Sequence, residues 1–152
     1  MLRGATELNL DAKGRMALPA SERERIRSAY GSGEMILTIN FQERCLWLYP
    51  LEEWDRIEKT LTSLSSLDKN IVRMKRLLLG HAKDCSLDGQ GRIAISPFLR
   101  EYAGLQKKVV VMGQGNKYEI WDSQTFNTLR DQWIEEQASM EDMGDSAPDV
   151  PL

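Results

Sequence analysis

The chain has 152 residues, enough for one well-cored domain or for two small units that share a core, but not for two large domains. No apolar run approaches the ~20 residues of a membrane span, and the first residues lack the apolar region of a signal peptide, so we expect a cytosolic protein without a membrane partner. The formal net charge is -3, but residues 131–152 hold seven of the 23 acidic residues and no basic one, which leaves residues 1–130 at +4 and does not exclude nucleic acid.

The first predicted elements are two short strands joined by a tight turn. The strands span residues 5–10 and 15–18, and the turn between them is Asp11-Ala12-Lys13-Gly14. Gly14 supplies the backbone freedom that a tight reversal needs, and the Asp11 carboxylate can accept hydrogen bonds from amides two residues on. The two strands are therefore expected to form a hairpin with a basic tip.

Helices and strands alternate through the rest of the first half. Pro19 suits the first turn of a helix, and Gly31-Ser32-Gly33 is a typical helix end. The elements predicted next are a helix over 20–29, a second hairpin formed by strands over 35–39 and 45–49, and two helices within 51–79 that a break near 65–68 separates.

The second half of the chain repeats the first. The segment over 10–19 returns 77 residues later over 87–96, with Asp, Gly and Arg at the same offsets. Self-similarity on this scale indicates one supersecondary unit that is used twice. The repeat predicts strands over 83–87 and 92–95, a helix over 97–103, strands over 108–112 and 117–121, and a last helix over 124–136.

The residues of the repeated turn divide into two groups. Asp11, Gly14, Asp88 and Gly91 are predicted to shape the two turns. The arginine that follows each glycine is not required by the turn, because a solvated arginine contributes little to stability. The presence of this arginine in both copies indicates a recognition surface, since the guanidinium fork suits phosphates and the edge of guanine. In the second copy Gln90 lies two residues before the arginine, and a glutamine side chain can bind adenine.

Few other residues favour a chemical site. Cys45 and Cys85 occupy non-equivalent places in the two halves, which predicts small buried residues rather than a disulfide. His81 is the single histidine, so a metal site with the two cysteines is disfavoured, and no nucleophile, base and acid set is available. We therefore expect no enzyme activity, no cofactor, no metal and no small-molecule substrate. The basic cluster at 73–76 is interpreted as a solvated helix face.

Several separated segments resemble the MraZ family of bacterial transcriptional regulators, and the resemblance runs from residue 1 to about 135. It implies an α+β fold of two tandem SpoVT-AbrB domains, each an AbrB-like β-barrel unit of the swapped-hairpin type, related by pseudo-two-fold symmetry and joined by connecting helices. The matching segments are Met1-Leu2-Arg3-Gly4-Ala5-Thr6, Asn9-Leu10-Asp11-Ala12-Lys13-Gly14-Arg15, Leu48-Tyr49-Pro50-Leu51-Glu52-Glu53-Trp54, Arg76-Leu77-Leu78-Leu79-Gly80-His81-Ala82 and Asp88-Gly89-Gln90-Gly91-Arg92.

The predicted organisation places the two SpoVT-AbrB domains on either side of a helical linker. The boundaries are 5–52 for the first domain, 53–80 for the helical connector, 81–124 for the second domain, 125–138 for a C-terminal helix and 139–152 for an acidic tail expected to be disordered.

The resemblance also implies a partner and an assembly. It implies binding to short direct repeats in the promoter of the protein's own division and cell-wall operon, repression of that operon, a nucleoid-associated location, and a ring of several chains. By position, the expected DNA contacts are Arg3, Lys13, Arg15, Gln90 and Arg92. We expect the first tip to dominate because it carries Lys13 where the second carries Gln90.

Two alternatives remain open at this point. Arg92 could serve subunit packing by pairing with an acidic side chain of a neighbour. The whole chain could instead be an AbrB-type protein-interaction or antitoxin-like module without operator-specific DNA binding. A small enzyme that uses Asp11 and Asp88 is a weaker third possibility, because no substrate pocket is indicated.

Overall fold

A computed structural model describes residues 1–140 and 150–152, so most of the predicted acidic tail over 139–152 lies outside the described residues. The predicted elements form close to the expected positions. In chain order they are β1 (Ala5–Asn9), β2 (Arg15–Ala17), α1 (Ala20–Tyr30), β3 (Glu34–Ile39), β4 (Leu46–Pro50), α2 (Leu51–Ser63), α3 (Lys69–Leu78), β5 (Lys83–Ser86), β6 (Arg92–Ala94), α4 (Pro97–Tyr102), β7 (Lys108–Gly113), β8 (Tyr118–Asp122) and α5 (Ser123–Ser139).

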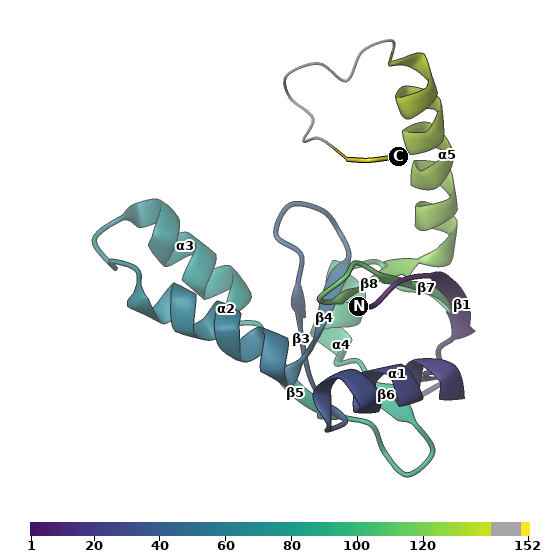
Figure 1. The fold of residues 1–152 in the computed structure, drawn as a ribbon, viewed down its shortest axis with the longest axis horizontal. Helices are drawn as coiled ribbons and strands as arrows, with labels where there is room; N and C mark the ends of the chain where they lie inside the picture. The colour runs from purple at the N-terminus through teal and green to yellow at the C-terminus, as the bar shows by residue number, and fades with distance from the viewer. Residues whose placement is uncertain (141–149) are drawn as a thin grey trace.

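Six of the strands form one antiparallel sheet in the order β1-β7-β8-β4-β3-β5 (Figure 1). The sheet is open, with β1 and β5 at its edges, so its six strands do not close into a barrel and the β-barrel units expected from the resemblance are not confirmed. The reason is the turn at the end of each edge strand, which directs β2 and β6 out of the sheet. These two short strands pair with each other in a separate antiparallel ribbon.

The strand partners differ in part from the predicted ones. The β3–β4 and β7–β8 hairpins form as predicted. The predicted hairpin of β1 with β2 is wrong, because β1 pairs with β7 and β2 pairs with β6. Turn residues determine where the chain reverses, but they do not determine which strand the returning segment meets. Each half therefore adds a strand to the hairpin of the other half, and the two predicted domains share one sheet.

The main core lies between the sheet, the β2–β6 ribbon, α1 and α4. Met16 and Ile93, the central residues of the ribbon, are buried there with Ile26 of α1, Leu99 of α4 and Ile120 of the sheet. Complete burial of one such side chain contributes about 1.5–3 kcal/mol. Because both halves supply this core, the ribbon is held in place by the whole molecule.

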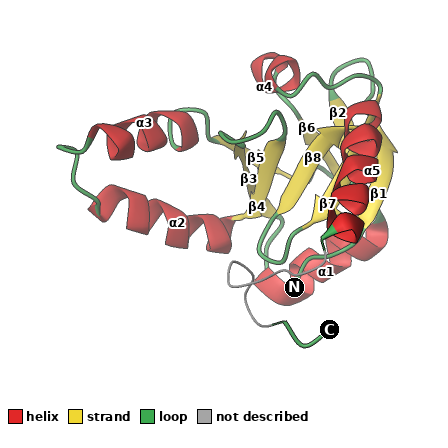
Figure 2. Ribbon diagram, turned by 90° about the horizontal axis from the view of Figure 1, so that it is seen from above, coloured by secondary structure: helices red, strands yellow, loops and turns green. Residues whose placement is uncertain are grey.

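The other sheet face carries the remaining helices in two separate groups (Figures 1 and 2). Alternation along the strands turns Ile36 and Val110 to this side. The α2–α3 helices form an arm that projects from one end, packed through Trp54 and Leu78. Helix α5 covers the other end through Phe126. In the described part of the chain, no helix has the length and apolar character needed to cross a bilayer.

Candidate nucleic-acid interface

The Asp11 carboxylate stabilises the first turn by accepting three hydrogen bonds. Oδ1 of Asp11 accepts hydrogen bonds from the backbone N–H groups of Lys13 and Arg15, each at 2.9 Å. Oδ2 accepts from Nε of Arg15 at 2.8 Å. The Gly14 N–H donates to the Asp11 carbonyl at 3.0 Å, and Gly14 has a φ of 75°, which favours glycine. We call residues 11–15 the first tip.

The second turn has the same geometry, and we call residues 88–92 the second tip. The Asp88 carboxylate accepts from the N–H groups of Gln90 at 2.8 Å and Arg92 at 2.9 Å, and from Nε of Arg92 at 2.8 Å. Gly91 has a φ of 74°. The repeated motif therefore encodes one local structure twice, with the same three hydrogen bonds to the aspartate and the same positive φ at the glycine.

The arginines are more closely tied to the turns than the sequence indicated. Each one forms an ion pair with the aspartate of its own tip, so Arg15 and Arg92 are part of the turn structure. Only Nε is engaged. Among the described residues, neither terminal Nη group has a protein partner. An arginine held in this way presents its remaining donors in a fixed direction, which suits recognition of a phosphate or a base edge.

The hydrogen bonds of the tips lower the pKa of both aspartates. The largest cause at Asp11 is the backbone N–H of Arg15, and the largest at Asp88 is the backbone N–H of Arg92; partial desolvation opposes both. Both carboxylates are therefore ionised at neutral pH, and each is neutralised locally by its arginine.

This lowered pKa predicts a specific acid sensitivity. The stabilisation from the tips should be complete above the ordinary Asp pKa of 3.8 and should be lost as pH falls through the lower pKa of the folded state. A double variant, Asp11→Asn with Asp88→Asn, keeps the shape but cannot titrate. Urea unfolding from pH 6 to pH 2.5 should give a shallower loss of stability for the variant. Identical acid slopes for both proteins would contradict the bracing role of the carboxylates.

The β2–β6 ribbon brings the two tips together on one surface. The register pairs Arg15 with Ala94 and Ala17 with Arg92. Since the middle residues of both strands face the core, these four residues lie on the outer face, with the two alanines exposed. Along the ribbon, the two arginines are separated by two residues, roughly 7 Å. The outer face thus presents two oriented arginines beside two small side chains.

Two further arginines lie against the tips, and the sequence analysis missed them. A Cβ atom built on Gly14 would lie 2.6 Å from Cζ of Arg100, and one built on Gly91 would lie 2.6 Å from Cδ of Arg23. Each tip is therefore covered by an arginine from the other half of the chain. The sequence repeat could have indicated them, because Arg23 and Arg100 are also 77 residues apart and lie four residues beyond the repeated segments over 10–19 and 87–96.

The remaining predicted contacts are not all brought to this surface. Lys13 and Gln90 are exposed within the first and second tips. Arg3 is exposed, but it precedes β1 whereas the first tip follows that strand, so the length of β1 separates them. Its carbonyl accepts a hydrogen bond from Arg25 of α1 at 3.2 Å. A role for Arg3 in DNA binding stays a prediction, and Arg3 does not lie beside the first tip.

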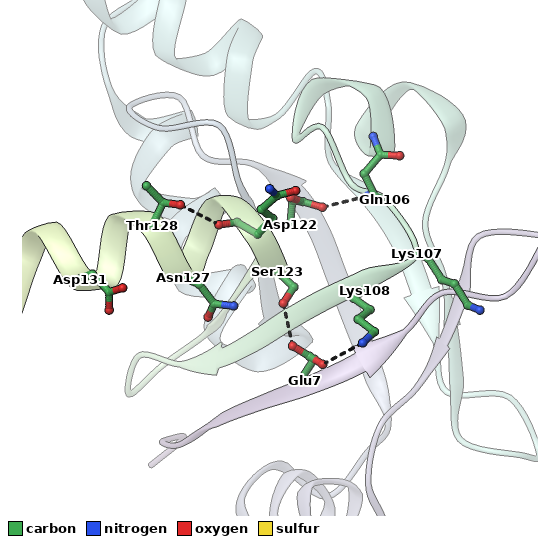
Figure 3. A pocket seen from close by; sticks show the side chains of 10 residues that line it. Glu7, Gln106, Lys107, Lys108, Asp122, Ser123, Asn127, Thr128 and Asp131 are labelled. Carbon is green, nitrogen blue, oxygen red and sulfur yellow. Dashed lines mark hydrogen bonds and ion pairs between the residues drawn. The ribbon is translucent and has the colours of Figure 1, made fainter.

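A hollow of about 620 Å³ lies elsewhere, where α5 begins beside β1 and β7 (Figure 3). Its polar groups bind one another. Ser123 donates to Glu7 at 2.7 Å, and the Gln106 N–H donates to Asp122 at 3.1 Å. Lys108 lies 4.0 Å from Glu7. These contacts tie β1 of the first half to α5 of the second, and they give this hollow a structural role.

The cysteines and the histidine do not assemble into a site. Both cysteines are free, Cys45 is buried and Cys85 is half-buried, and burial raises the pKa of each thiol to about 12. His81 bonds the Leu77 carbonyl through Nδ1 at 2.9 Å and stacks on Phe98. Within the part of the chain that the structure describes, no group of three metal-binding side chains occurs.

Comparisons with known proteins agree on one family. The model of the family described as "MraZ protein, putative antitoxin-like" matches the chain twice, over residues 1–77 and 78–145. A protein of Halorhodospira halophila named "Transcriptional regulator MraZ" is 50% identical over 139 residues, which cover 91% of each chain. Proteins with the same name from Thioalkalivibrio sulfidiphilus and Yersinia pseudotuberculosis are 49% and 45% identical, with 90% and 100% of each chain covered.

Proposed function

The chain belongs to the MraZ family, and on that premise we propose that it is a DNA-binding transcriptional regulator whose DNA interface is the β2–β6 ribbon with its two tips. The observation that carries this proposal is the outer face of the ribbon, where Arg15 and Arg92 are each oriented by an aspartate. The names of the relatives agree with this class of function.

The dimensions of the ribbon support binding in the major groove. That groove admits a two-stranded β-ribbon, and arginine is the side chain that most often contacts guanine there. The spacing of roughly 7 Å between Arg15 and Arg92 corresponds to about two base-pair steps. Ala17 and Ala94 leave room for the bases between the arginines. Lys13 and Gln90 would follow the groove at the two ends of the ribbon.

We infer that the first tip contributes more of the affinity. Lys13 and Arg15 give it two cationic side chains, whereas Gln90 and Arg92 give the second tip one. Contacts of cations with phosphates supply most of the sequence-independent affinity. The second tip then contributes mainly through Arg92 and through the adenine-binding potential of Gln90.

The finer proposal concerns target and assembly. We propose that the protein acts in the cytoplasm on nucleoid DNA, binds short direct repeats in the promoter of its own division and cell-wall operon, and represses that operon as a ring of identical chains. One ribbon makes few contacts and binds weakly. Several ribbons on one assembly can engage successive repeats, and the linked contacts multiply the affinity through effective concentration.

A second candidate is a protein-interaction module of the antitoxin-like kind, which the description of the matching family favours. In that case the tips would bind a protein surface, and DNA binding would be absent or unspecific. The two functions differ in their response to salt and in their dependence on DNA sequence.

The test is a titration of the protein with its own upstream DNA at several salt concentrations. For a DNA regulator, log K should fall linearly with log salt, by about 0.9 for each phosphate neutralised. Lys13→Gln, which makes the first tip resemble the second, should lower the slope by about 0.9 for each bound first tip. Scrambled DNA serves as the control. Equal affinity for scrambled and promoter DNA would favour the interaction module.

A further inference from the structure

Helices α2 and α5 occupy corresponding places in the two halves, but they differ in how well they are covered. Each follows the last strand of a hairpin, and residues 72 positions apart correspond, so Leu61 of α2 is matched by Trp133 of α5. At the start of the helices, Trp54 and Phe126 are both buried. Further along, Leu61 is only 5% exposed, whereas Trp133 is 37% exposed.

The difference arises from α3, which packs beside α2. Leu61 belongs to an apolar cluster that includes Met74 and Leu78 of α3. The two aromatic rings beside Trp133 both belong to its own half of the chain, with ring centroids at 5.8 Å for Trp121 and 6.2 Å for Phe126. In the described residues no helix follows α5 in the way that α3 follows α2, and Figure 1 shows the end of α5 extending away from the body.

The uncovered part of α5 combines an apolar surface with acidic side chains. Ile134, next to Trp133, is 61% exposed. Asp131, Glu135 and Glu136 surround these two residues in sequence. Asp131 is paired with Arg130 at 3.2 Å, whereas Glu135 and Glu136 form no ion pair among the described residues, so this part of α5 keeps a net negative charge. Large apolar side chains that remain exposed inside a charged rim are typical of interaction surfaces.

The arm carries a surface with the opposite charge. Helix α3 contains four basic residues and no acidic one. A hollow of about 410 Å³ on the arm is lined by Leu67 and Val72 together with Lys69, Arg73 and Arg76. Leu67 is 95% exposed. Apolar side chains inside a basic rim thus match the apolar side chains inside an acidic rim on α5.

We propose that the exposed face of α5 in one copy of the chain docks on the arm hollow of a second copy. The two surfaces cannot meet within one chain, because the arm and α5 lie at opposite ends of the sheet in both views (Figures 1 and 2). The contact joins two different surfaces, so it is head-to-tail and can close into a ring. This inference rests on the proposed oligomer and specifies the contact that builds it.

Two variants, each defective in one surface, test the contact. The arm variant is Leu67→Asp with Arg76→Glu, and the α5 variant is Ile134→Asp. All three side chains are exposed, so neither change removes buried packing. Arg27→Glu, on the exposed surface of α1, is the control that matches the charge change at Arg76. Native mass is measured without DNA, so the result does not depend on the DNA-binding proposal.

The expected masses distinguish this contact from other interfaces. Wild type and the Arg27→Glu control should form the same oligomer, whereas each defective variant should fall to the 17.4 kDa protomer. An equimolar mixture of the two variants retains one intact arm and one intact α5 surface per pair, so it should yield a heterodimer of twice 17.4 kDa. A monomeric wild type, unchanged masses of the variants, or a mixture without heterodimer would each overturn the proposal.

Discussion

Arg15→Ala is expected to abolish specific promoter binding while leaving the native mass of the protein unchanged. A good arginine contact with a base contributes about 1–3 kcal/mol of discrimination, and 1.4 kcal/mol corresponds to a factor of ten. When two or more first tips bind linked repeats, the loss at each tip multiplies. Gel-shift titration at fixed salt measures the effect, and undiminished affinity would contradict a direct role for Arg15.

The ion pair with Asp11 requires a control for this experiment, because removing Arg15 also frees one oxygen of the aspartate. Asp11→Ala removes the brace and keeps the arginine. If Arg15 contacts DNA, Arg15→Ala should weaken binding more than Asp11→Ala does. Equal losses would mean that the arginine acts only by shaping the turn. Arg92→Ala, at the second tip, should cost less than Arg15→Ala since that tip has no lysine.

Local structure in this chain was predictable from sequence because it depends on local chemistry. The positions of Pro19, Gly14 and Gly31 indicated where a helix begins, where a turn reverses and where the helix ends, and each stands in that role. The aspartates of both tips were likewise assigned to the turns from their ability to accept hydrogen bonds from nearby amides, and those bonds are present.

Contacts between distant segments were predicted less well. The turn at Asp11 predicted a hairpin of β1 with β2, yet β2 finds its partner in β6, 77 residues later. Both choices bury Met16, so the alternation of apolar residues does not distinguish them. The cover of Gly14 by Arg100 is also a contact between the halves. The contribution of Arg15 to the turn was not predicted, because an arginine four residues after an aspartate was expected to be solvated. The turn instead brings Nε of Arg15 to 2.8 Å from the Asp11 carboxylate.

Ile93→Ala is expected to have the opposite pattern to Arg15→Ala, with a large loss of stability and little loss of intrinsic DNA affinity. Ile93 is completely buried at the centre of the ribbon, opposite Met16. Truncation of a buried isoleucine to alanine costs about 2–5 kcal/mol, and a domain has only about 5–15 kcal/mol in total. Urea denaturation should therefore show a much lower midpoint, and Ile93→Val, which removes one methylene, should cost about 0.5–1.5 kcal/mol.

The neighbouring residue provides the matched control for this variant. Ala94 lies on the exposed face of the same strand, so Ala94→Ser should leave the unfolding midpoint nearly unchanged. Below the denaturation range, the folded fraction of Ile93→Ala should bind promoter DNA within a few-fold of wild type, because its side chain faces the core and not the groove. The contrary result would be an Ile93→Ala protein that is as stable as wild type but no longer binds DNA. It would contradict the arrangement in which Met16 and Ile93, buried in the core, hold both tips in register.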